Sequence, residues 1–516
     1  MHYKAPKSRN QIILFPEVDN WVSADNPVRL FDLFVDKLVG SQPEKFIWKG
    51  KSSVGCTSYS PATMLKLLLY GYLNKIAGSR CLENETYRNI EMIWLLGDLH
   101  PDHWTICSYR RENKEQIRYM TIEFRKFLKA EGYIDGKTTA TDGSKFKAYA
   151  SRNMLSMETI EKRLKSLDEK LEEYLSEFGK VDTIEELKTE LLDGEEAENI
   201  NSALIEKIVN LQEQIAKLET QKEQLENSEK NYLAPNDPDA NLMKSTDGKI
   251  AGYNTQTTVC KKNHMVTTAE VTTEANDIDE LKTNLDTLKE QLDIEPETLE
   301  ADTGYSNTNQ IEEIEETTQT KCYVSFPKNS KKQQEKEAGI GFEYDKENDE
   351  YTCSQGKTLK LKSKNHKNRN QTYNVYQCKD CGDCPLRDKC TKSKIGRIIK
   401  RNVKQDWIDE FKKRMKKSES KEKIKERKAI VEHPFGTIKW MMGKNHFLLT
   451  RKHKVQIEID LYATAYNFKR LINIESFEEL MRKMDNYQWG GAKDAHQKTA
   501  PSFREIFSTQ QIFFKN

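Results

Sequence analysis

The sequence predicts an α/β fold: a mixed sheet with an all-α N-terminal domain, a coiled-coil helical insertion and a cysteine-rich insertion. Three observations support this prediction. Helical patterns fill the first 130 residues, Thr- and Val-rich segments alternate with amphipathic helices from 131 to 327, and a long heptad tract interrupts the sheet. At 516 residues the chain is too long for one ordinary hydrophobic core, so we expect several folded units.

The bulk composition excludes a membrane protein. Hydrophobic residues make up 36% of the chain and charged residues 32%, which is typical of a large hydrated surface. The most apolar stretch, at 63–73, is too short to span a bilayer and contains Lys66. The N-terminus has no apolar core followed by a small-residue cleavage site, so we expect a cytoplasmic protein.

The net charge of +1 conceals two strongly charged regions. Residues 155–230 hold 21 acidic and 10 basic residues, whereas residues 357–428 hold 25 basic and 9 acidic residues. A polyanion would be attracted to the second region and repelled by the first. A solvated lysine-rich surface without a polyanionic partner is the alternative explanation.

The N-terminal 130 residues predict a compact helical domain. In "NPVRLFDLFVDKLV" the apolar side chains of Leu30, Phe31, Phe34 and Leu38 share one helical face. The segment "SPATMLKLLLYGYLNKIA" begins with Ser-Pro, as a helix start does. Two further helical segments follow, separated by Gly-Asp and Pro-Asp.

Two heptad tracts predict a coiled-coil insertion at 154–235. Apolar residues from Ile160 to Phe178, and again from Leu204 to Leu218, alternate in steps of four and three. Glycines at 179 and 194 lie between the tracts, which favours an antiparallel helical hairpin. Such a hairpin could be an intramolecular spacer or a dimerisation element.

Strand-like segments on both sides of this insertion predict one sheet. "KTTATDGSKF" precedes it, and "GYNTQTTVC", "MVTTAEVTT", "ETLEAD" and "KCYVSF" follow it. We therefore assign 131–153, 236–327 and 426–475 to the sheet domain. A basic cysteine-rich insertion occupies 328–425, and a C-terminal tail occupies 476–516.

Three acidic residues lie at positions where a sheet domain can place a metal site. Asp142 ends a Thr-rich strand, Asp302 ends a short strand, and Glu432 is expected to open a helix that contains Pro434 and Gly436. Converging carboxylates repel one another unless cations neutralise them, and Mg²⁺ prefers carboxylate oxygens. For each acid alone an ordinary structural role is the simpler explanation, because Asp-Gly is a common turn.

Several motifs together resemble the bacterial insertion-sequence transposases with a DDE catalytic triad. They are "TDGSKFKAYAS", "DPDANLMK", "GYNTQT", "LEADTGYSN" and "VEHPFGTIK", in the family's order, preceded by segments that look like its helical N-terminal module. The resemblance extends to about residue 485. It implies a ribonuclease H-like catalytic domain, and Asp142, Asp302 and Glu432 as ligands of two Mg²⁺ ions.

The resemblance also implies DNA-binding residues on the last helix. The family signature Y-x2-R-x3-E-x6-K is matched by Glu432 and Lys439, and Lys439 would contact DNA phosphate. The tyrosine position is Lys425 and the arginine position is Lys428, with Arg427 beside it. Arg427 and Lys428 are the remaining candidates for DNA contacts.

Five cysteines within the basic insertion suggest a structural metal site. Their spacing is C-x24-C-x2-C-x2-C-x5-C, and clustered thiols in a reducing compartment bind metal more often than they form disulfides. Four thiolates around one Zn²⁺ ion are the simplest explanation of so dense a set. Because "CPLRDKC" resembles the family's cysteine motif, we expect Cys353, Cys381, Cys384 and Cys390 as ligands, with Cys378 the spare. An iron-sulfur cluster and unligated thiols are the alternatives.

The resemblance implies a transposase that binds the terminal inverted repeats of its insertion sequence and catalyses metal-dependent cleavage and strand transfer. Its partners would be element-end and target DNA, and synapsis of two ends would make it a homodimer. Three alternatives stay open: a catalytically inactive transposase-derived DNA-binding protein, a ribonuclease H-like nuclease, and a zinc-dependent interaction scaffold.

Overall fold

The structure is a computed structural model, and it describes residues 17–48, 58–150, 154–188, 195–228, 230–245, 248–327, 335, 337–368, 371–443 and 446–491. Side chains are described for all of these except 177–205 and 368. The chain divides into two compact units, one formed by 1–71, 76–127 and 471–516 and the other by 72–75 and 128–470. Within the described ranges, no helix has the length and apolarity that crossing a bilayer requires.

The first unit consists of helices, as the sequence predicts. They are α1 (Val28–Ser41), α2 (Pro61–Leu73), α3 (Ser79–Arg88), α4 (Ile90–Leu96), α5 (His103–Glu112), α6 (Lys114–Ala130) and α16 (Phe477–Asn486), with short 3-10 helices at Val18–Trp21, Pro43–Lys45 and Trp489–Gly491. Aromatic rings fill its core: the Phe34 centroid lies 5.1 Å from that of Phe124 and 4.9 Å from that of Trp489. Residues 1–16 are part of the segment that resembles the family's helical N-terminal module, and they lie outside the described residues.

The expected C-terminal tail contributes to this first unit. Helix α16 begins after the cap Ser476, whose Oγ accepts a hydrogen bond from Glu479 N at 3.3 Å. Leu480, Met484 and Trp489 are buried. Residues 476–491 are therefore folded onto the helical unit, although their sequence gives no sign of this long-range contact; residues 492–516 lie outside the described residues.

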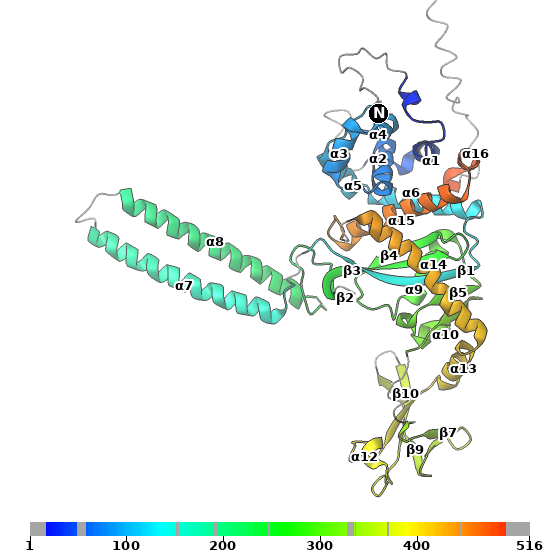
Figure 1. Ribbon diagram of the computed structural model, residues 1–516. Coiled ribbons are helices and arrows are strands. Elements are labelled where there is room, and N and C mark those ends of the chain that lie inside the picture. Colours follow the sequence, from blue (N-terminus) through cyan, green and yellow to red (C-terminus); the bar gives the residue numbers. More distant parts are fainter. Residues whose placement is uncertain are drawn as a thin grey trace, which may run out of the picture. The chain divides into compact units, whose positions relative to one another are not determined.

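The second unit is built around a six-stranded mixed sheet (Figure 1). Its strands are β1 (Thr138–Lys147), β2 (Asn241–Ser245), β3 (Gly248–Cys260), β4 (Val266–Thr272), β5 (Thr298–Ala301) and β6 (Lys321–Val324). The order is β2-β3-β1-β5-β6, with β4 also paired to β3. β1 pairs antiparallel with β3 and parallel with β5, and β5 pairs parallel with β6. The sequence prediction of a mixed α/β architecture is therefore confirmed.

Helices cover both faces of this sheet. Helices α9 (Leu281–Leu292) and α10 (Thr308–Thr317) pack in one hydrophobic cluster with Leu299 and Ala301 of β5. Long helices α14 (Ser418–Met442) and α15 (Lys452–Ile474) follow later in the chain. On β1, Phe146 packs against Phe435 of α14, with their ring centroids 6.3 Å apart.

Helix α14 differs from the prediction at its start. We expected Glu432 to open a helix, but α14 begins at Ser418 and runs through Pro434 to Met442. Basic residues with good helix propensity precede Glu432, so they extend the helix on its N-terminal side. Pro434 is buried, and packing against the sheet compensates for the backbone hydrogen bond that its missing N–H removes.

The predicted helical insertion forms two long helices, α7 (Met157–Lys188) and α8 (Glu195–Glu226), which lie side by side (Figure 1). They run antiparallel, since Lys222 Nζ lies 3.9 Å from Glu161 Oε1 and Lys207 Nζ lies 5.7 Å from the Tyr174 ring centroid. Ile160, Leu218 and Leu225 form a buried cluster at their base. The heptad positions Phe178 and Leu204 have side chains outside the described set.

The cysteine-rich segment contains a second sheet of five strands. They are β7 (Phe342–Asp345), β8 (Glu350–Cys353), β9 (Thr358–Asn368), β10 (Gln371–Gln377) and β11 (Ile398–Asn402), with a short helix α12 (Arg387–Cys390). Helix α13 (Gln405–Met415) follows, and its Phe411 and Met415 pack in the cluster of α9 and α10. The insertion's own sheet thus ends at Asn402, and α13 packs on the main sheet domain.

Candidate active site

Asp142 lies on the central strand of the main sheet, level with the end of β5. Ala140 pairs with Glu300 of β5, so Asp142 is two residues beyond that pair on the same face of β1. Its Oδ1 accepts a hydrogen bond from Gly143 N at 3.0 Å. The second oxygen, Oδ2, is therefore available to a different partner.

Asp302 follows β5 directly and lies at the same edge. Its side chain caps the 3-10 helix Thr303–Tyr305, where Oδ1 accepts a hydrogen bond from Gly304 N at 2.7 Å. Because β1 and β5 are parallel, their carboxyl ends bring Asp302 close enough to Asp142 for the two charges to interact. The sheet thus brings together two of the three predicted acids.

The electrostatics of this edge favour the neutral form of Asp142. Burial raises the pKa of Asp142 to about 6, the Arg427 charge opposes that rise, and the Asp302 charge adds to it. The Asp142 side chain is 23% exposed, so solvent still reaches it. A desolvated Asp142 beside the charge of Asp302 forms an environment in which a cation is stabilised.

Arg427 supplies the positive charge that faces Asp142. Its Nη1 lies 3.3 Å from Asp142 Oδ2, and only 9% of the Arg427 side chain is exposed. The Nε and Nη1 groups of Arg427 find no hydrogen-bond acceptor among the described residues. A buried guanidinium beside two carboxylates offsets part of their negative charge.

Glu432, the third predicted acid, lies on the exposed side of α14. It is five residues from Arg427, which corresponds to about 140° around a helix. Glu432 makes no hydrogen bond or ion pair with another described residue, and no three acidic, histidine or cysteine side chains in the described ranges are close enough to share a metal ion. The structure therefore does not bring Glu432 to the two aspartates.

The predicted DNA-binding residues of α14 divide between its two sides. Arg427 is buried, whereas Lys428, Glu432 and Lys439 are exposed. Lys439 Nζ lies 5.3 Å from the centroid of the Phe146 ring, at the far end of β1 from Asp142. Lys428 and Lys439 thus present positive charge along the exposed side of the helix.

A third aspartate, Asp277, lies against the glycine that follows Asp142. A Cβ on Gly143 would come within 2.3 Å of Asp277 Oδ1, so only glycine fits there without movement. The same carboxylate oxygen accepts hydrogen bonds from Lys145 Nζ, Asn254 Nδ2 and Gln256 Nε2 at 3.0, 2.6 and 2.7 Å. These bonds explain why β1 and β3 carry polar side chains on the face of the sheet that Asp277 contacts.

Tyr305 links that network to Asp302. Its hydroxyl donates to Gln256 Oε1 at 2.5 Å, and Asn284 Nδ2 of α9 donates to the same oxygen at 2.9 Å. Tyr305 is fully buried, and the charges of Asp277 and Asp302 help to raise its pKa well above the ordinary value, after the larger effect of burial. The network therefore fixes the turn that holds Asp302 relative to β1.

Glu300 is a further buried acid on the face of β5 that α14 covers. It is fully buried, and neither carboxylate oxygen has a hydrogen-bond partner among the described residues. Burial raises the pKa of Glu300 to about 7, an effect that the nearby Lys261 charge reduces and the Glu426 charge increases. An unpaired buried acid destabilises the fold at neutral pH.

Comparison with known families identifies the chain. A family model described as transposase DDE domain matches residues 352–472, and one described as transposase domain DUF772 matches residues 16–112. Both matches support an insertion-sequence DDE transposase. Neither a curated protein nor a solved structure matches it.

The two matches cover different parts of the transposase. The DUF772 match falls on the helical unit, and the DDE match covers the cysteine segment and α14, including Arg427, Glu432 and Lys439. Asp142 and Asp302 lie outside both matched ranges. Their connection with the matched helix rests on the geometry described above.

The cysteines of the transposase lie close together in pairs. The Cys378 thiol interacts with that of Cys381, and burial, followed by this contact, raises the pKa of Cys378 to about 11, with a smaller contribution from Cys353. Burial also raises the pKa of Cys390, which lies in the field of Cys381 and Cys384. Cys381 thus interacts with Cys378 and contributes to the field at Cys390, and which four of the five cysteines would bind Zn²⁺ stays a prediction.

Three site residues could not be assigned from the sequence. From the sequence, Arg427 was expected only to contact DNA, and Asp277 and Glu300 carry no motif signal that separates them from the other acidic residues among the 82 of the chain. For Asp277 a weak signal exists, because Gly143 and Gly304 both lie beside it. For Glu300 the signal is an acid at a position where a short buried strand requires an apolar residue.

Proposed function

We propose that this transposase binds the ends of its own insertion sequence and cuts and joins DNA by divalent-metal chemistry at Asp142 and Asp302. The supporting observation is the meeting of these carboxylates at one sheet edge, facing the buried Arg427. A phosphodiester bound there would meet Arg427 as a donor, and the aspartates would hold the cation that the reaction needs.

The strand order supports a ribonuclease H-like catalytic domain. β1 is central, β3 and β4 form an antiparallel pair on one side, and the parallel β5 and β6 lie on the other. This arrangement agrees with the fold that the family resemblance implies. It also explains how acids 160 residues apart in sequence reach the same edge.

The residues present fit a magnesium site in part. Asp142 and Asp302 each have one oxygen that is not bound by a backbone N–H, and carboxylate oxygens are the ligands that Mg²⁺ prefers. Mg²⁺ would lower the pKa of an attacking water and stabilise the leaving oxygen. Glu432 would complete the ligand set only after α14 turns its exposed side toward β1.

The other parts of the transposase have proposed roles in handling DNA. The helical unit would bind the terminal inverted repeats, and the exposed Lys428 and Lys439 would contact phosphates. Helices α7 and α8 would hold two copies together at paired element ends. A structural Zn²⁺ at the cysteine cluster would stabilise a segment with little apolar core of its own.

The test uses the full-length transposase and duplex DNA carrying the element's end. Asp142→Asn and Asp302→Asn keep the shape of the side chain but remove its charge, so both are expected to lose at least about 100-fold in Mg²⁺-dependent strand cleavage and joining. Glu422→Gln on the exposed side of α14 is the matched control, expected to leave activity unchanged. Full activity of either aspartate variant would refute the proposal.

The position of Glu432 favours one alternative, a catalytically inactive transposase-derived DNA-binding protein. In that case the wild-type protein would bind element-end DNA but neither cut nor join it with Mg²⁺ or Mn²⁺. A ribonuclease H-like nuclease would cut without joining. If the proposed function holds, Glu432→Gln reduces cleavage as strongly as the aspartate variants do.

A further inference from the structure

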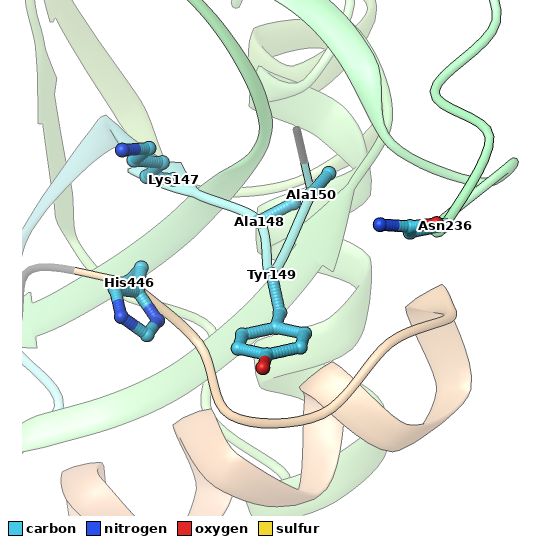
Figure 2. A pocket seen from close by; sticks show the side chains of 6 residues that line it. All are labelled: Lys147, Ala148, Tyr149, Ala150, Asn236 and His446. Atoms are coloured by element: carbon cyan, nitrogen blue, oxygen red, sulfur yellow. The ribbon is translucent and has the colours of Figure 1, made fainter. Parts of the chain in front are cut away.

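A cavity of about 320 Å³ lies at the end of β1, beyond the acids (Figure 2). It is lined by Lys147, Ala148, Tyr149, Ala150, Asn236 and His446. Lys147 is five residues from Asp142 along the same strand, a separation of about 17 Å. The cavity is thus outside the acidic site, at the end of the same strand.

Three polar groups of this cavity have no partner among the described residues. In the described ranges, the Lys147 ammonium, the Asn236 amide and the Tyr149 hydroxyl make no hydrogen bond or ion pair. The Tyr149 side chain is 57% exposed, which is unusual for an aromatic residue in a folded domain. A cation, an amide and an aromatic ring are therefore all free to meet a ligand.

The rings of Tyr149 and His446 form one side of the cavity, and Asn236 lies across from them (Figure 2). Their centroids are 5.8 Å apart and their planes are tilted by 49°. His446 Nδ1 lies 2.8 Å from the Phe447 carbonyl oxygen, so it donates and leaves Nε2 toward solvent. A backbone hydrogen bond from Phe447 N to Lys147 O, 3.0 Å long, fixes this arrangement.

We propose that this cavity binds a single unstacked nucleotide of the DNA substrate. The volume suits one nucleotide, since small-ligand sites begin at about 300 Å³. Tyr149 and His446 would stack on the base, Asn236 would hydrogen-bond its edge, and Lys147 would neutralise its phosphate. A protein segment would need more apolar surface than two aromatic rings supply.

The position of the cavity relative to the acids gives the inference a specific geometry. A separation of about 17 Å corresponds to about five base-pair steps of B-form DNA. The cavity would therefore receive a nucleotide flanking the cut phosphate and not the reacting nucleotide itself. The inference rests on the proposed function, because it assumes that DNA passes along β1 from the acids.

Crosslinking tests this inference without requiring catalysis. The probe is a DNA duplex with a ten-nucleotide single-stranded tract that contains 5-iododeoxyuridine, irradiated with the full-length transposase. We expect the crosslinked peptides, identified by mass spectrometry, to contain Tyr149 or His446. Crosslinks confined to other peptides would overturn the inference even if Asp142 and Asp302 prove essential for cleavage.

Affinity measurements with the same probe compare the wild type with matched variants. Tyr149→Ala is expected to weaken binding by about 5- to 150-fold, whereas Tyr149→Phe keeps the ring and should stay near wild type. Lys147→Ala should weaken binding and reduce its salt dependence, whereas the control Lys249→Ala, an exposed lysine on β3, should not. Equal affinities for Tyr149→Ala and wild type would also overturn the inference.

The two proposals fail in different ways. If the aspartate variants still cut DNA while Tyr149 crosslinks, the catalytic proposal is wrong and the nucleotide site stands. If Tyr149→Ala binds DNA normally and the aspartate variants are inactive, the nucleotide site is wrong and the catalytic proposal stands. Because the exposed Tyr149 contributes nothing to the core, its variants should unfold at the wild-type temperature.

Discussion

Arg427 of α14 and Asp142 of β1 form an ion pair in which Nη1 lies 3.3 Å from Oδ2. Gly143 N binds the other oxygen of Asp142, so Arg427 faces the oxygen through which Asp142 would bind a metal ion. The guanidinium and a divalent cation would therefore compete for the same carboxylate. In the absence of metal, Arg427 reduces the repulsion that Asp142 experiences from Asp302.

Replacing Arg427 should therefore destabilise the protein more without metal than with it. In EDTA, Arg427→Ala is expected to lose about 1–3 kcal/mol of unfolding free energy, less than a fully buried pair because Asp142 is 23% exposed. With saturating Mg²⁺ the loss should shrink, since the ion replaces the missing charge. Urea denaturation under both conditions measures this loss.

The exposed pair Arg482–Glu479 provides a control, and Arg482→Ala should show little loss in either buffer. An Arg427→Ala loss that Mg²⁺ does not reduce would contradict the competition.

Glu300 predicts a stability that falls as the pH rises. Its folded pKa of about 7 lies above the ordinary value of 4.5, so the folded state binds more protons between these values and stability declines across that window. Glu300→Leu removes the buried charge and should stabilise the protein at pH 8 by up to about 3 kcal/mol, with no such gain at pH 4. Denaturation at several pH values measures the difference. Part of the decline should remain in the variant, because Asp142 titrates near pH 6. An equal gain at both pH values would show that packing, not charge, is responsible.

The sequence predicted the elements of this fold better than their long-range contacts. The Thr-rich composition around Asp142 and the heptads after Ile160 reflect local preferences, so strands and long helices could be assigned. The packing of Trp489 against Phe34 and the contact of α13 with the main sheet domain involve partners far apart in the chain. No local pattern encodes such partners.

The residues of the candidate site could likewise be predicted only in part from the sequence. Strand ends located Asp142 and Asp302, because parallel strands bring their carboxyl ends together. The direction of Glu432 was not predictable, since it depends on which face of α14 the sheet buries, and that face is set by Val431, Phe435 and Ile438. The same packing buries Arg427 beside Asp142.

The glycine after Asp142 should tolerate no side chain, whereas a glycine of α14 should. In Gly143→Ala the new Cβ would lie 2.3 Å from Asp277 Oδ1 and 2.6 Å from Gln256 Nε2, so we expect a loss of about 1–3 kcal/mol. Gly436 in α14 has nothing within 4 Å of the same position, and Gly436→Ala should add about 0.5–1 kcal/mol through helix propensity. Thermal denaturation separates the two. Adding Asp277→Ala to Gly143→Ala should relieve the steric part of the loss, and a double variant worse than the sum of the single ones would contradict this account.

The cysteine segment should contain zinc that depends on Cys381. This thiol interacts with Cys378 and contributes to the field at Cys390, so Cys381→Ser removes the central member of the cluster. Elemental analysis of protein purified without chelators is expected to give about one Zn²⁺ per chain in the wild type and little in Cys381→Ser. Cys81→Ser changes an exposed cysteine of the helical unit and should keep the metal. Since Zn²⁺ binds thiolates, the metal should be lost as the pH falls and protons compete for the thiols. Wild-type protein without zinc, or iron in its place, would refute the assignment.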